Sequence, residues 1–544
     1  MPINSFAEAD QYLREQLLPQ ITVSAEIVSD TDAYNAQIPP LKDFVADPNT
    51  YPLYGAQPTD DANTVYVEIY SSAEKANAAR DDERWLVDVA ERFNQQQNRL
   101  PSGEIIQVGV RNIPSGLGAQ ILAAGKGKPA GYTPAHALWP ELLKADGLDQ
   151  VETISPGLVS TSAIFALRPE IYRKLAEGGD VTFDRLIDAI LAGGIKVGYS
   201  NPYIASSALN FLYSLLWHSA GHQADGKPLT LAELASPEIS SVFDTFQQQV
   251  VLTTPTYLDL KQIWLRNPTA FDVIVMAHQS YVGLIQQPGF DDFKYVSFGI
   301  PEASPLVSFA WTTASEKAAL AQFAAFATSA EMQQLAEKQG YQKLEHLKQN
   351  NVPPLPSGEV LKAAQSFWKR RKDGGRTVYM EVVIDTSGSM ADENKLAAVQ
   401  RALQVASQQI SPSNQIGLIT FSDHPVRRIP LAPYSELEQK RLFTAIEQLR
   451  SDGATALYDG LAVGLADLME KQKQDAEGQF YLLLLTDGER TDGLRFNQIE
   501  AVIRHSGVRV YPIAYGGAPK STLERSHRLK KALYTKGRPK KCRH

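Results

Sequence analysis

Residues 377–390 read TVYMEVVIDTSGSM, an apolar run of strand length that ends in a short polar loop. A run that is apolar on both faces is typical of a strand buried inside a parallel sheet. Doubly wound sheets place their ligand sites at the carboxyl ends of such strands. Asp385, Ser387 and Ser389 lie at this end, so they are the first candidates for a binding site.

Two later loops carry side chains of the same chemistry. Thr455 lies in the loop before a predicted helix, and Asp487 directly follows the apolar run at 480–485. Strand ends of one sheet meet at one edge, so both residues can reach the same ion as the first loop. Carboxylate and hydroxyl oxygens are hard ligands, which suit Mg²⁺ or Mn²⁺ better than softer metals. A simple strand-to-helix turn with a serine N-cap would explain one such loop, but not three in register.

The segment around these loops alternates strands and helices. This order is typical of a doubly wound, Rossmann-like α/β sheet, and we predict one over residues 376–517. The expected strands are 377–385, 415–421, 480–486 and 508–515, and the expected helices are 393–410, 435–450, 456–472 and 496–505.

The chain before this segment divides by composition. Residues 1–60 are polar and rich in Pro, Asp and Asn, and we interpret them as an irregular extension with one short helix near 6–17. Strand and helix patterns alternate through 61–355, which predicts another α/β domain. Prolines and a glycine pair mark 356–375 as a linker that includes one helix. Residues 518–544 form a basic tail, with ten Lys or Arg against one acidic residue.

Small polar residues follow three strand ends of the domain at 61–355. Each group stands where a helix begins, and the free N–H groups of a helix start favour anions. Ordinary N-capping needs the same residue types, so each group alone is better explained as a cap. Three groups at strand ends together support a ligand site about as well as they support capping. The candidate ligand-binding residues are Ser71, Ser72, Ser115, Gly116, Asn201, Tyr203 and Ser206.

The motifs DTSGSM (385–390), DGATALYDGL (452–461) and LLLTDGE (483–489) resemble the three loops of the von Willebrand factor A domain. The resemblance implies a metal-ion-dependent adhesion site for Mg²⁺ or Mn²⁺, to which a protein partner supplies an Asp or Glu carboxylate. The family normally closes with a helix after its last strand, and here Gly516 and Gly517 lead into the basic tail instead. The metal ligands that the resemblance implies, direct or through water, are Asp385, Ser387, Ser389, Thr455 and Asp487.

The segment 63–350 resembles a bacterial extracellular solute-binding protein of the two-lobed, periplasmic type II class. The resemblance is carried by ERWLVDVAERFNQQ, VGYSNPYIASSALNFL, FDVIVMAHQSYVGL, YVSFGIPEASPLVSFAW and SAEMQQLAEKQGY. It implies two lobes that close on a ligand by hinge motion, with chain crossings near 150–160 and 265–280. It also implies a place in the cell envelope, although the N-terminal sequence lacks a signal-peptide pattern.

We therefore expect a non-enzymatic binding, adhesion or scaffold protein. Its A-domain-like part would capture a protein partner through a divalent metal, and its solute-binding-like part can sense a small solute or anion. Two other functions stay open: a solute receptor of a transport system, for example for an oxyanion, and an accessory subunit of an AAA+ ATPase. No nucleophile–base pair, P-loop or GxSxG motif in the sequence indicates catalysis.

Composition excludes several other classes of protein. The 544-residue chain has 43% apolar residues and a net charge of −8, which fits a globular protein better than a disordered or nucleic-acid-binding one. Its single cysteine, Cys542, cannot form an internal disulfide or a Cys-ligated zinc site. No run of about 18 apolar residues predicts a transmembrane helix. The basic tail can bind an anionic surface, but we favour a solvated end or a reading-frame change.

Overall fold

The computed structural model describes residues 3–39, 45–148, 150–344, 347, 352–408, 410–488 and 490–514. The chain forms two compact units, which are described separately. The terminal unit combines the N-terminal segment up to Phe44 with the chain from Gly375 onward, and the central unit runs from Val45 to Gly374. The central unit is therefore an insertion between two parts of one domain. Among the described helices, none combines the length and the apolar character that a membrane span requires.

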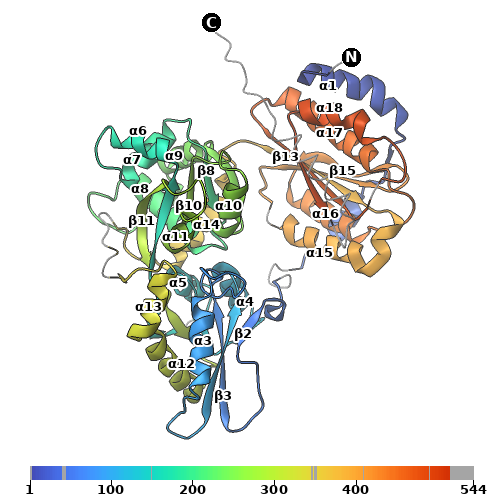
Figure 1. The fold of residues 1–544 in the computed structure, drawn as a ribbon. Helices are drawn as coiled ribbons and strands as arrows, with labels where there is room; N and C mark the ends of the chain where they lie inside the picture. The colour runs from blue at the N-terminus through green and yellow to red at the C-terminus, as the bar shows by residue number, and fades with distance from the viewer. Residues whose placement is uncertain are drawn as a thin grey trace. The chain divides into compact units, whose positions relative to one another are not determined.

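A single sheet, six-stranded within the described residues, forms the centre of the terminal unit (Figure 1). Its strand order is β1-β15-β14-β13-β16-β17, and neighbours are parallel except for the antiparallel pair of β14 and β15. β13, the strand quoted above, lies inside the sheet as its apolar sequence predicts. The strands are β1 (Ser24–Ala25), β13 (Val378–Asp385), β14 (Gln415–Phe421), β15 (Pro425–Pro433), β16 (Gln479–Thr486) and β17 (Arg509–Ala514).

Helices cover both faces of this sheet, as expected for a doubly wound α/β fold. Successive residues of β13 face opposite sides, because side chains alternate along a strand. Val383 packs in the core beside α17 and α18, whereas Val382 and Ile384 pack in the core beside α15 and α16. The elements are the 3₁₀ helix η7 (Gly388–Asn394) and the helices α15 (Lys395–Ser407), α16 (Glu436–Glu447), α17 (Leu457–Gln474) and α18 (Phe496–His505).

The first residues of the chain complete this domain, so the expectation of an irregular extension over 1–60 is wrong. β1 adds a parallel strand to the edge of the sheet, with Ser24 opposite Val426. The short helix α2 (Asp30–Asn35) packs against α16. Residues from 45 onward belong to the central unit instead. The polar composition of this stretch favoured an irregular structure. One short added strand and one buried helix face need few apolar residues, however, so a polar segment can still complete the domain.

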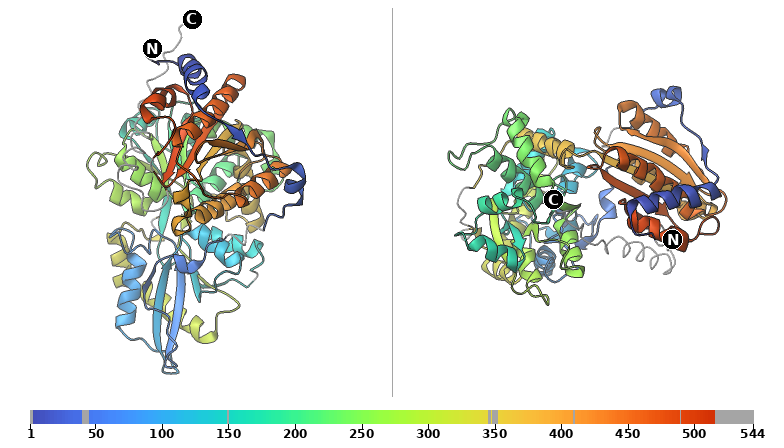
Figure 2. Two further views of the ribbon diagram at one scale, coloured as in Figure 1. Left: turned by 90° about the vertical axis from the view of Figure 1, so that its right-hand side faces the viewer. Right: turned by 90° about the horizontal axis from the view of Figure 1, so that it is seen from above.

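The predicted helix near 6–17 is present as α1 (Phe6–Tyr12) and the π-helical turn η1 (Leu13–Leu17). Ala9, Leu13 and Leu17 are spaced four residues apart, which places them on one face of a helix. All three are at most 1% exposed and join the core that α17 and α18 form. Figure 2 shows this N-terminal helix lying across the helices of the terminal unit.

The central unit consists of two lobes, each built on one sheet. The sheet of lobe 1 has the order β2-β4-β3-β5-β12-β6 within the described residues. Its strands are β2 (Leu53–Gly55), β3 (Thr64–Ser71), β4 (Ile105–Asn112), β5 (Gly131–Thr133), β6 (Glu152–Ser155) and β12 (Leu306–Ser308). Its helices are α3 (Trp85–Gln95), α4 (Ser115–Ala123), α5 (Leu138–Ala145), α12 (Ala314–Ala327) and α13 (Ala330–Lys338).

The sheet of lobe 2 has the order β11-β7-β10-β8-β9 within the described residues. Its strands are β7 (Thr161–Leu167), β8 (Val197–Ser200), β9 (Val250–Thr254), β10 (Val273–Ala277) and β11 (Lys294–Glu302). Its helices are α6 (Pro169–Ala176), α7 (Phe183–Leu191), α8 (Ser206–Ser219), α9 (Pro237–Gln247), α10 (Tyr257–Arg266) and α11 (His278–Leu284).

Both sheets follow one topological rule. In each, the strand that arrives from the other lobe lies next to an edge strand: β12 lies between β5 and β6, and β7 lies between β10 and β11. This repeated order agrees with the type II two-lobed fold expected from the sequence. The chain passes from lobe 1 to lobe 2 between Ser155 and Thr161, inside the expected range of 150–160.

The second predicted crossing, near 265–280, is wrong. That stretch holds β10, which pairs with β7 and β8 inside the sheet of lobe 2. The chain returns to lobe 1 between Glu302 and Leu306, where only three residues separate β11 from β12. So short a connection leaves no loop signal in the sequence, because both flanking runs are apolar.

The predicted linker at 356–375 is also wrong, because most of it is the helix α14 (Gly358–Arg371) of the central unit. Leu361, Ala364 and Phe367 of this helix are at most 3% exposed and belong to the main core of that unit. The predicted domain at 61–355 therefore extends from 45 to 374. The described part of the predicted A-like domain ends at 514, and the basic tail at 518–544 lies outside the described residues.

Replacing Leu13 by Ala tests the contribution of the N-terminal segment to the terminal unit. Loss of a fully buried leucine costs about 2–5 kcal/mol, because it leaves a cavity. We expect thermal unfolding of the full chain to show the transition of the terminal unit at a lower temperature, while the other transition is unchanged. Leu231→Ala is the matched control, since Leu231 is 54% exposed. Equal unfolding profiles of both variants would contradict the assignment.

Candidate functional site

Asp385 ends β13 and is fully buried at the carboxyl edge of the terminal sheet. Its Oδ1 accepts a hydrogen bond from the Ser387 backbone N–H at 2.9 Å, and its Oδ2 accepts one from the Thr486 hydroxyl at 2.6 Å. Burial raises the pKa of Asp385, while the hydrogen bonds from Ser387 and Thr486 oppose this shift. The carboxyl group is therefore held in one orientation in a place where a negative charge lacks solvation.

The two serines connect this carboxylate to the second one. The Oγ atoms of Ser387 and Ser389 lie 3.2 Å apart. The Ser389 hydroxyl donates to Oδ1 of Asp487, which follows β16, at 2.8 Å. Ser387 and Asp487 are buried as well. The structure thus brings four of the five predicted metal ligands into one hydrogen-bonded cluster.

Thr455, the fifth residue, lies in a loop that is bonded to the first loop. The Gly388 N–H donates to the Gly453 carbonyl at 3.1 Å, and the Thr455 N–H donates to Oγ1 of Thr491 at 2.8 Å. Gly453 has a φ of +79°, and a Cβ there would lie 2.8 Å from the Asp423 carboxylate. Only glycine fits this close approach, which holds the loop beside the Asp-Thr-Ser-Gly-Ser motif.

The donor set fits a hard divalent cation. It combines two carboxylates with three hydroxyls, all of them oxygen ligands. The described residues contain no group of three or more His, Cys, Asp or Glu side chains placed to hold a metal. A metal at this edge would therefore depend on the hydroxyl groups as much as on Asp385 and Asp487.

Sequence reasoning missed one charged residue of this cluster. Lys395 is the first residue of α15, and its Nζ lies 2.7 Å from Oδ2 of Asp487. A lysine at the start of a helix carries no local signal that it faces a carboxylate about ninety residues later in the chain.

In the central unit, four of the seven predicted ligand residues form a contact between the lobes, and a fifth, Asn201, lies beside them in lobe 2. The Ser206 hydroxyl of α8 donates to Oγ of Ser115 on α4 at 3.1 Å. The Gly116 N–H donates to the Ile204 carbonyl at 2.9 Å, and a Cβ on Gly116 would lie 2.0 Å from the Tyr203 carbonyl oxygen. Asn201 is nearby and accepts the Tyr203 N–H through its Oδ1. These residues hold the lobes together at one side.

The remaining two residues, Ser71 and Ser72, are buried at the end of β3. The hydroxyl of Ser72 accepts a hydrogen bond from Lys75, which also donates to the Thr133 carbonyl at 2.8 Å. Lys75 is fully buried, and burial lowers its pKa to about 8. The structure thus places a buried cation beside the predicted serines, and no spacing rule in the sequence identified it.

Lobe 2 faces this lysine with further polar groups. Glu302, at the end of β11, is fully buried, and burial and the nearby Glu74 raise its pKa to about 8 while Lys75 opposes the shift. Four buried oxygen atoms here make no hydrogen bond of good geometry within the described residues. They are Oγ1 of Thr133, Oγ of Ser207, the hydroxyl of Tyr257 and Oε1 of Glu302.

A second contact between the lobes lies beside these groups. Nζ of Lys261 on α10 pairs with Oδ2 of Asp82 in lobe 1 at 2.9 Å. The side-chain amide of Gln279 also donates to the Asp82 carbonyl. We call the buried group of Ser72, Lys75, Thr133, Ser207, Tyr257 and Glu302 the inter-lobe cluster; its members come from both lobes. Unpaired buried oxygens are costly unless a ligand or water satisfies them.

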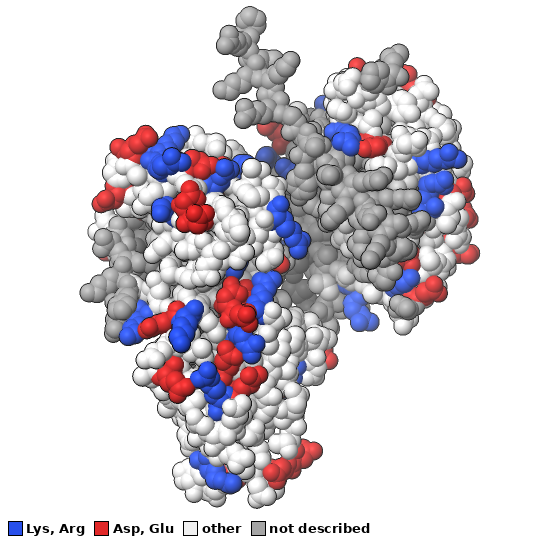
Figure 3. Space-filling model, viewed as in Figure 1, with Lys and Arg blue, Asp and Glu red and all other residues white. Residues whose placement is uncertain are grey.

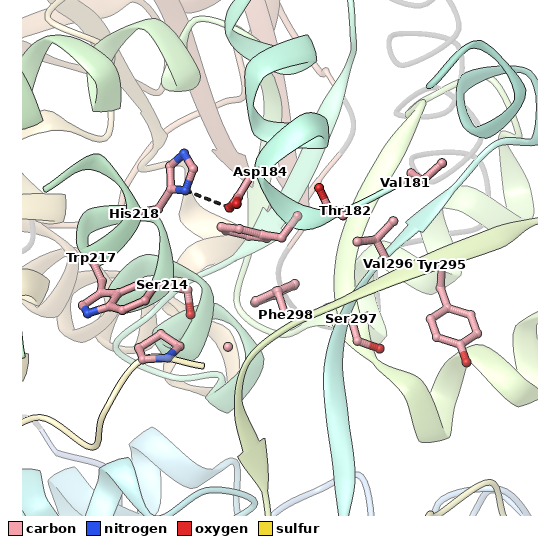
Figure 4. Close-up of a pocket in the computed structure, with 13 residues that line it drawn as sticks. Val181, Thr182, Asp184, Ser214, Trp217, His218, Tyr295, Val296, Ser297 and Phe298 are labelled. Carbon is pink, nitrogen blue, oxygen red and sulfur yellow. Dashed lines mark ion pairs between the residues drawn. The ribbon is translucent and has the colours of Figure 1, made fainter. Parts of the chain in front are cut away.

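A cavity of about 410 Å³ lies within lobe 2, between α7, α8 and β11 (Figure 4). Phe183, Phe298 and Trp217 line it, and Nδ1 of His218 pairs with Oδ1 of Asp184 at 3.0 Å. Since all three elements belong to one lobe, motion between the lobes does not open or close this cavity. The inter-lobe cluster is separate from it.

Surface charges of the central unit are mixed on the face that Figure 3 shows, where Lys and Arg alternate with Asp and Glu. Some of these form ion pairs, such as Arg92 with Glu331 at 2.8 Å. A protein that binds nucleic acid through its surface presents a stripe of one sign instead.

Solved structures similar to this chain have low sequence identity to it. The sulfate-binding protein SubI from Mycobacterium tuberculosis H37Rv is 15% identical and has a TM-score of 0.37 over 53% of this chain and 93% of its own. A periplasmic thiamin binding protein is 12% identical, with a TM-score of 0.41 over 59% of this chain and 99% of its own. A von Willebrand factor type A protein from Catenulispora acidiphila is 18% identical, with a TM-score of 0.25 over 28% and 37% of the two chains.

Two family models match the chain itself. The von Willebrand factor type A domain matches residues 380–532, and the bacterial extracellular solute-binding protein matches residues 77–342. No curated protein matches the chain. Members of both families typically bind or adhere rather than catalyse. The protein therefore joins a bacterial extracellular solute-binding domain to a von Willebrand factor type A domain.

Proposed function

We propose that this chain is a non-enzymatic binding protein whose A domain captures a protein partner through a divalent cation. The observation that supports this most is the hydrogen-bonded cluster in which Ser389 joins the Asp385 loop to Asp487. Four of the five oxygen-bearing side chains form this cluster, and the loop of Thr455 is bonded to the first loop through Gly388 and Gly453; such a donor set suits Mg²⁺ or Mn²⁺. When bound, the metal would offer an exchangeable position to an Asp or Glu carboxylate of the partner.

The residues of the chain have separate tasks in this proposal. Asp385 would supply the deepest charge, since both its oxygens are already oriented by Ser387 and Thr486. Ser387, Ser389 and Thr455 would complete the donor set without adding charge. The set contains only two carboxylates, so their charge equals that of a bound divalent cation. The site then carries no excess negative charge that would repel a third carboxylate from a partner.

Asp385→Asn tests this proposal with little change in shape. We expect calorimetric titration of Mn²⁺ or Mg²⁺ into the full chain to show saturable binding that the variant loses, because the amide removes the buried charge that the cation needs. Asp392→Asn is the matched control, since Asp392 is exposed on η7 and outside the donor set. Binding of equal strength in Asp385→Asn would rule out this metal site.

A specific observation supports a second activity, the binding of a small oxyanion between the lobes of the central unit. Lys75 offers a buried cation, and the buried hydroxyls of Thr133, Ser207 and Tyr257 can donate hydrogen bonds. The raised pKa of Glu302 keeps its carboxyl group protonated near neutral pH, so that it too can donate. An oxyanion accepts hydrogen bonds from all of these groups, so it fits the inter-lobe cluster better than a cation does.

Lys75→Met removes the one cation of the inter-lobe cluster. Loss of a charge-assisted hydrogen bond costs about 1.5–3 kcal/mol, so we expect about 10- to 100-fold weaker binding of an oxyanion that the wild type binds. Titration with sulfate, phosphate and molybdate measures this effect. Lys126→Met serves as control, because Lys126 is exposed in the same lobe. A wild type that binds none of the three anions would contradict the oxyanion proposal.

Glu302 also predicts a pH dependence of stability. Its folded pKa of about 8 lies above the ordinary value of 4.5, so the folded state retains a proton that the unfolded state releases. This contribution is complete below about pH 4.5 and is lost as the pH rises through about 8. Relative to Glu302→Gln, which stays neutral, the wild type should lose free energy of unfolding between these values.

Urea unfolding of both proteins at about pH 5 and about pH 8 measures this difference. Glu331→Gln is the control, since the side chain of Glu331 is 69% exposed. A constant difference between wild type and Glu302→Gln across this range would show that Glu302 is not protonated in the folded chain.

A further inference from the structure

Lys395 occupies a position in the adhesion site that the metal proposal does not explain. Its Nζ lies 2.7 Å from Oδ2 of Asp487 and 3.4 Å from the Ser389 carbonyl oxygen. The Asp487 side chain is only 1% exposed, and that of Lys395 is 17% exposed. Both carboxylate oxygens of Asp487 are thus engaged, Oδ1 by Ser389 and Oδ2 by Lys395.

The backbone has a left-handed residue directly before Lys395. Asn394, which ends η7, has φ of 57° and ψ of 28°, in the left-handed region that asparagine adopts more readily than most other non-glycine residues. The chain reverses there, and α15 begins with Lys395 directly after the turn. Conformations of this kind cost energy and persist where the surrounding structure holds them, often at functional sites.

The charges of the site show what the lysine can do. Asp385 and Asp487 bring two negative charges into a poorly solvated place, and Lys395 balances one of them. A buried carboxylate without a counter-charge is strongly destabilising, so the lysine stabilises the metal-free site. The same positive charge repels a divalent cation that approaches Asp487, and this repulsion is large where solvent is scarce.

We propose that Lys395 is a built-in counter-cation that competes with the divalent metal for Asp487 and thereby weakens metal binding. This inference rests on the proposed metal-binding function of the A domain. The competition raises the metal concentration needed to fill the site, because each bound metal ion must displace the lysine from the Asp487 carboxylate. It also predicts that removing the lysine charge has opposite effects on the metal-free and the metal-bound protein.

Lys395→Met tests this competition in the full chain, with two readouts. In a chelator, the variant should unfold at a lower temperature than wild type, because Asp487 has lost its partner. In Mg²⁺ or Mn²⁺, the difference should vanish or reverse. Calorimetric titration of Mn²⁺ should give a dissociation constant about tenfold lower in the variant, since a repulsive unit charge is gone.

Two variants serve as controls. Lys395→Arg retains the charge and should keep the metal affinity of the wild type within about twofold. Lys440→Met removes a lysine of the same unit that lies over Tyr34 instead, and it should leave metal affinity unchanged. A lysine that only supported the fold would destabilise the protein equally with and without metal.

The outcomes separate this inference from the proposed function. Equal or weaker metal binding by Lys395→Met, with wild type still binding through Asp385, would overturn the inference alone. Absence of metal binding in wild type and in Lys395→Met would overturn both. Binding that appears only in Lys395→Met would overturn the proposed function of the wild type and would support the competition between the lysine and the metal.

Discussion

The pairing of β1 with β15 is the contact on which the organisation of this protein depends. It joins Ser24 to a strand of the C-terminal domain, and Leu13 and Leu17 bury the adjacent helix in the same domain. The chain therefore leaves the A domain before the central unit and re-enters the same domain after it. The first connection precedes β2 in lobe 1, and the second follows α14, whose end is held to Asp244 of lobe 2 by Arg371. The solute-binding domain is thus an insertion with two chain connections, one that precedes β2 and one that follows α14.

Both candidate sites arise from the same physical situation. The strands of a parallel sheet have both faces buried and end in polar residues. Charged side chains therefore gather at the carboxyl ends of the strands. In the A domain the buried carboxylates of Asp385 and Asp487 are balanced in part by Lys395. In the central unit, Lys75 and Glu302 shift their pKa values in opposite directions because burial disfavours the charged form of each. In each site the buried charges do not cancel: the first has an excess negative charge and the second an excess positive charge.

The sequence alone was sufficient where a signal is local. β13 and its Asp-Thr-Ser-Gly-Ser loop could be predicted because an apolar run and its polar end lie within a few residues. β15 was not expected, since Pro425, Pro430 and Pro433 interrupt its pattern. The two-residue strand β1 covers only Val426 and Arg427, so most of β15 lies at the edge of the sheet, where prolines are tolerated. The return of the chain between Glu302 and Leu306 escaped detection for the opposite reason, an absence of any break.

The site residues divide in the same way. Hydroxyl groups next to strand ends could be found from spacing, and the seven residues chosen in the central unit do lie at helix starts or strand ends. Which of them touch each other depends on how the lobes meet, and that is set by tertiary packing. Lys75 and Glu302 come from different lobes, and Lys395 meets Asp487 across two elements. Such pairs have no local pattern, so only a three-dimensional arrangement could identify them.

The composite A domain also sets an order of events during synthesis. Ser24 and His424, whose side chains are 3.0 Å apart, are separated by 400 residues. A ribosome that adds about 5–20 residues per second needs about 20–80 s to make the intervening chain. The central unit is complete before β15 exists, so it can fold while the N-terminal segment still has no partner. During that interval the apolar face of Ala9, Leu13 and Leu17 is exposed, and the nascent chain needs protection there against aggregation.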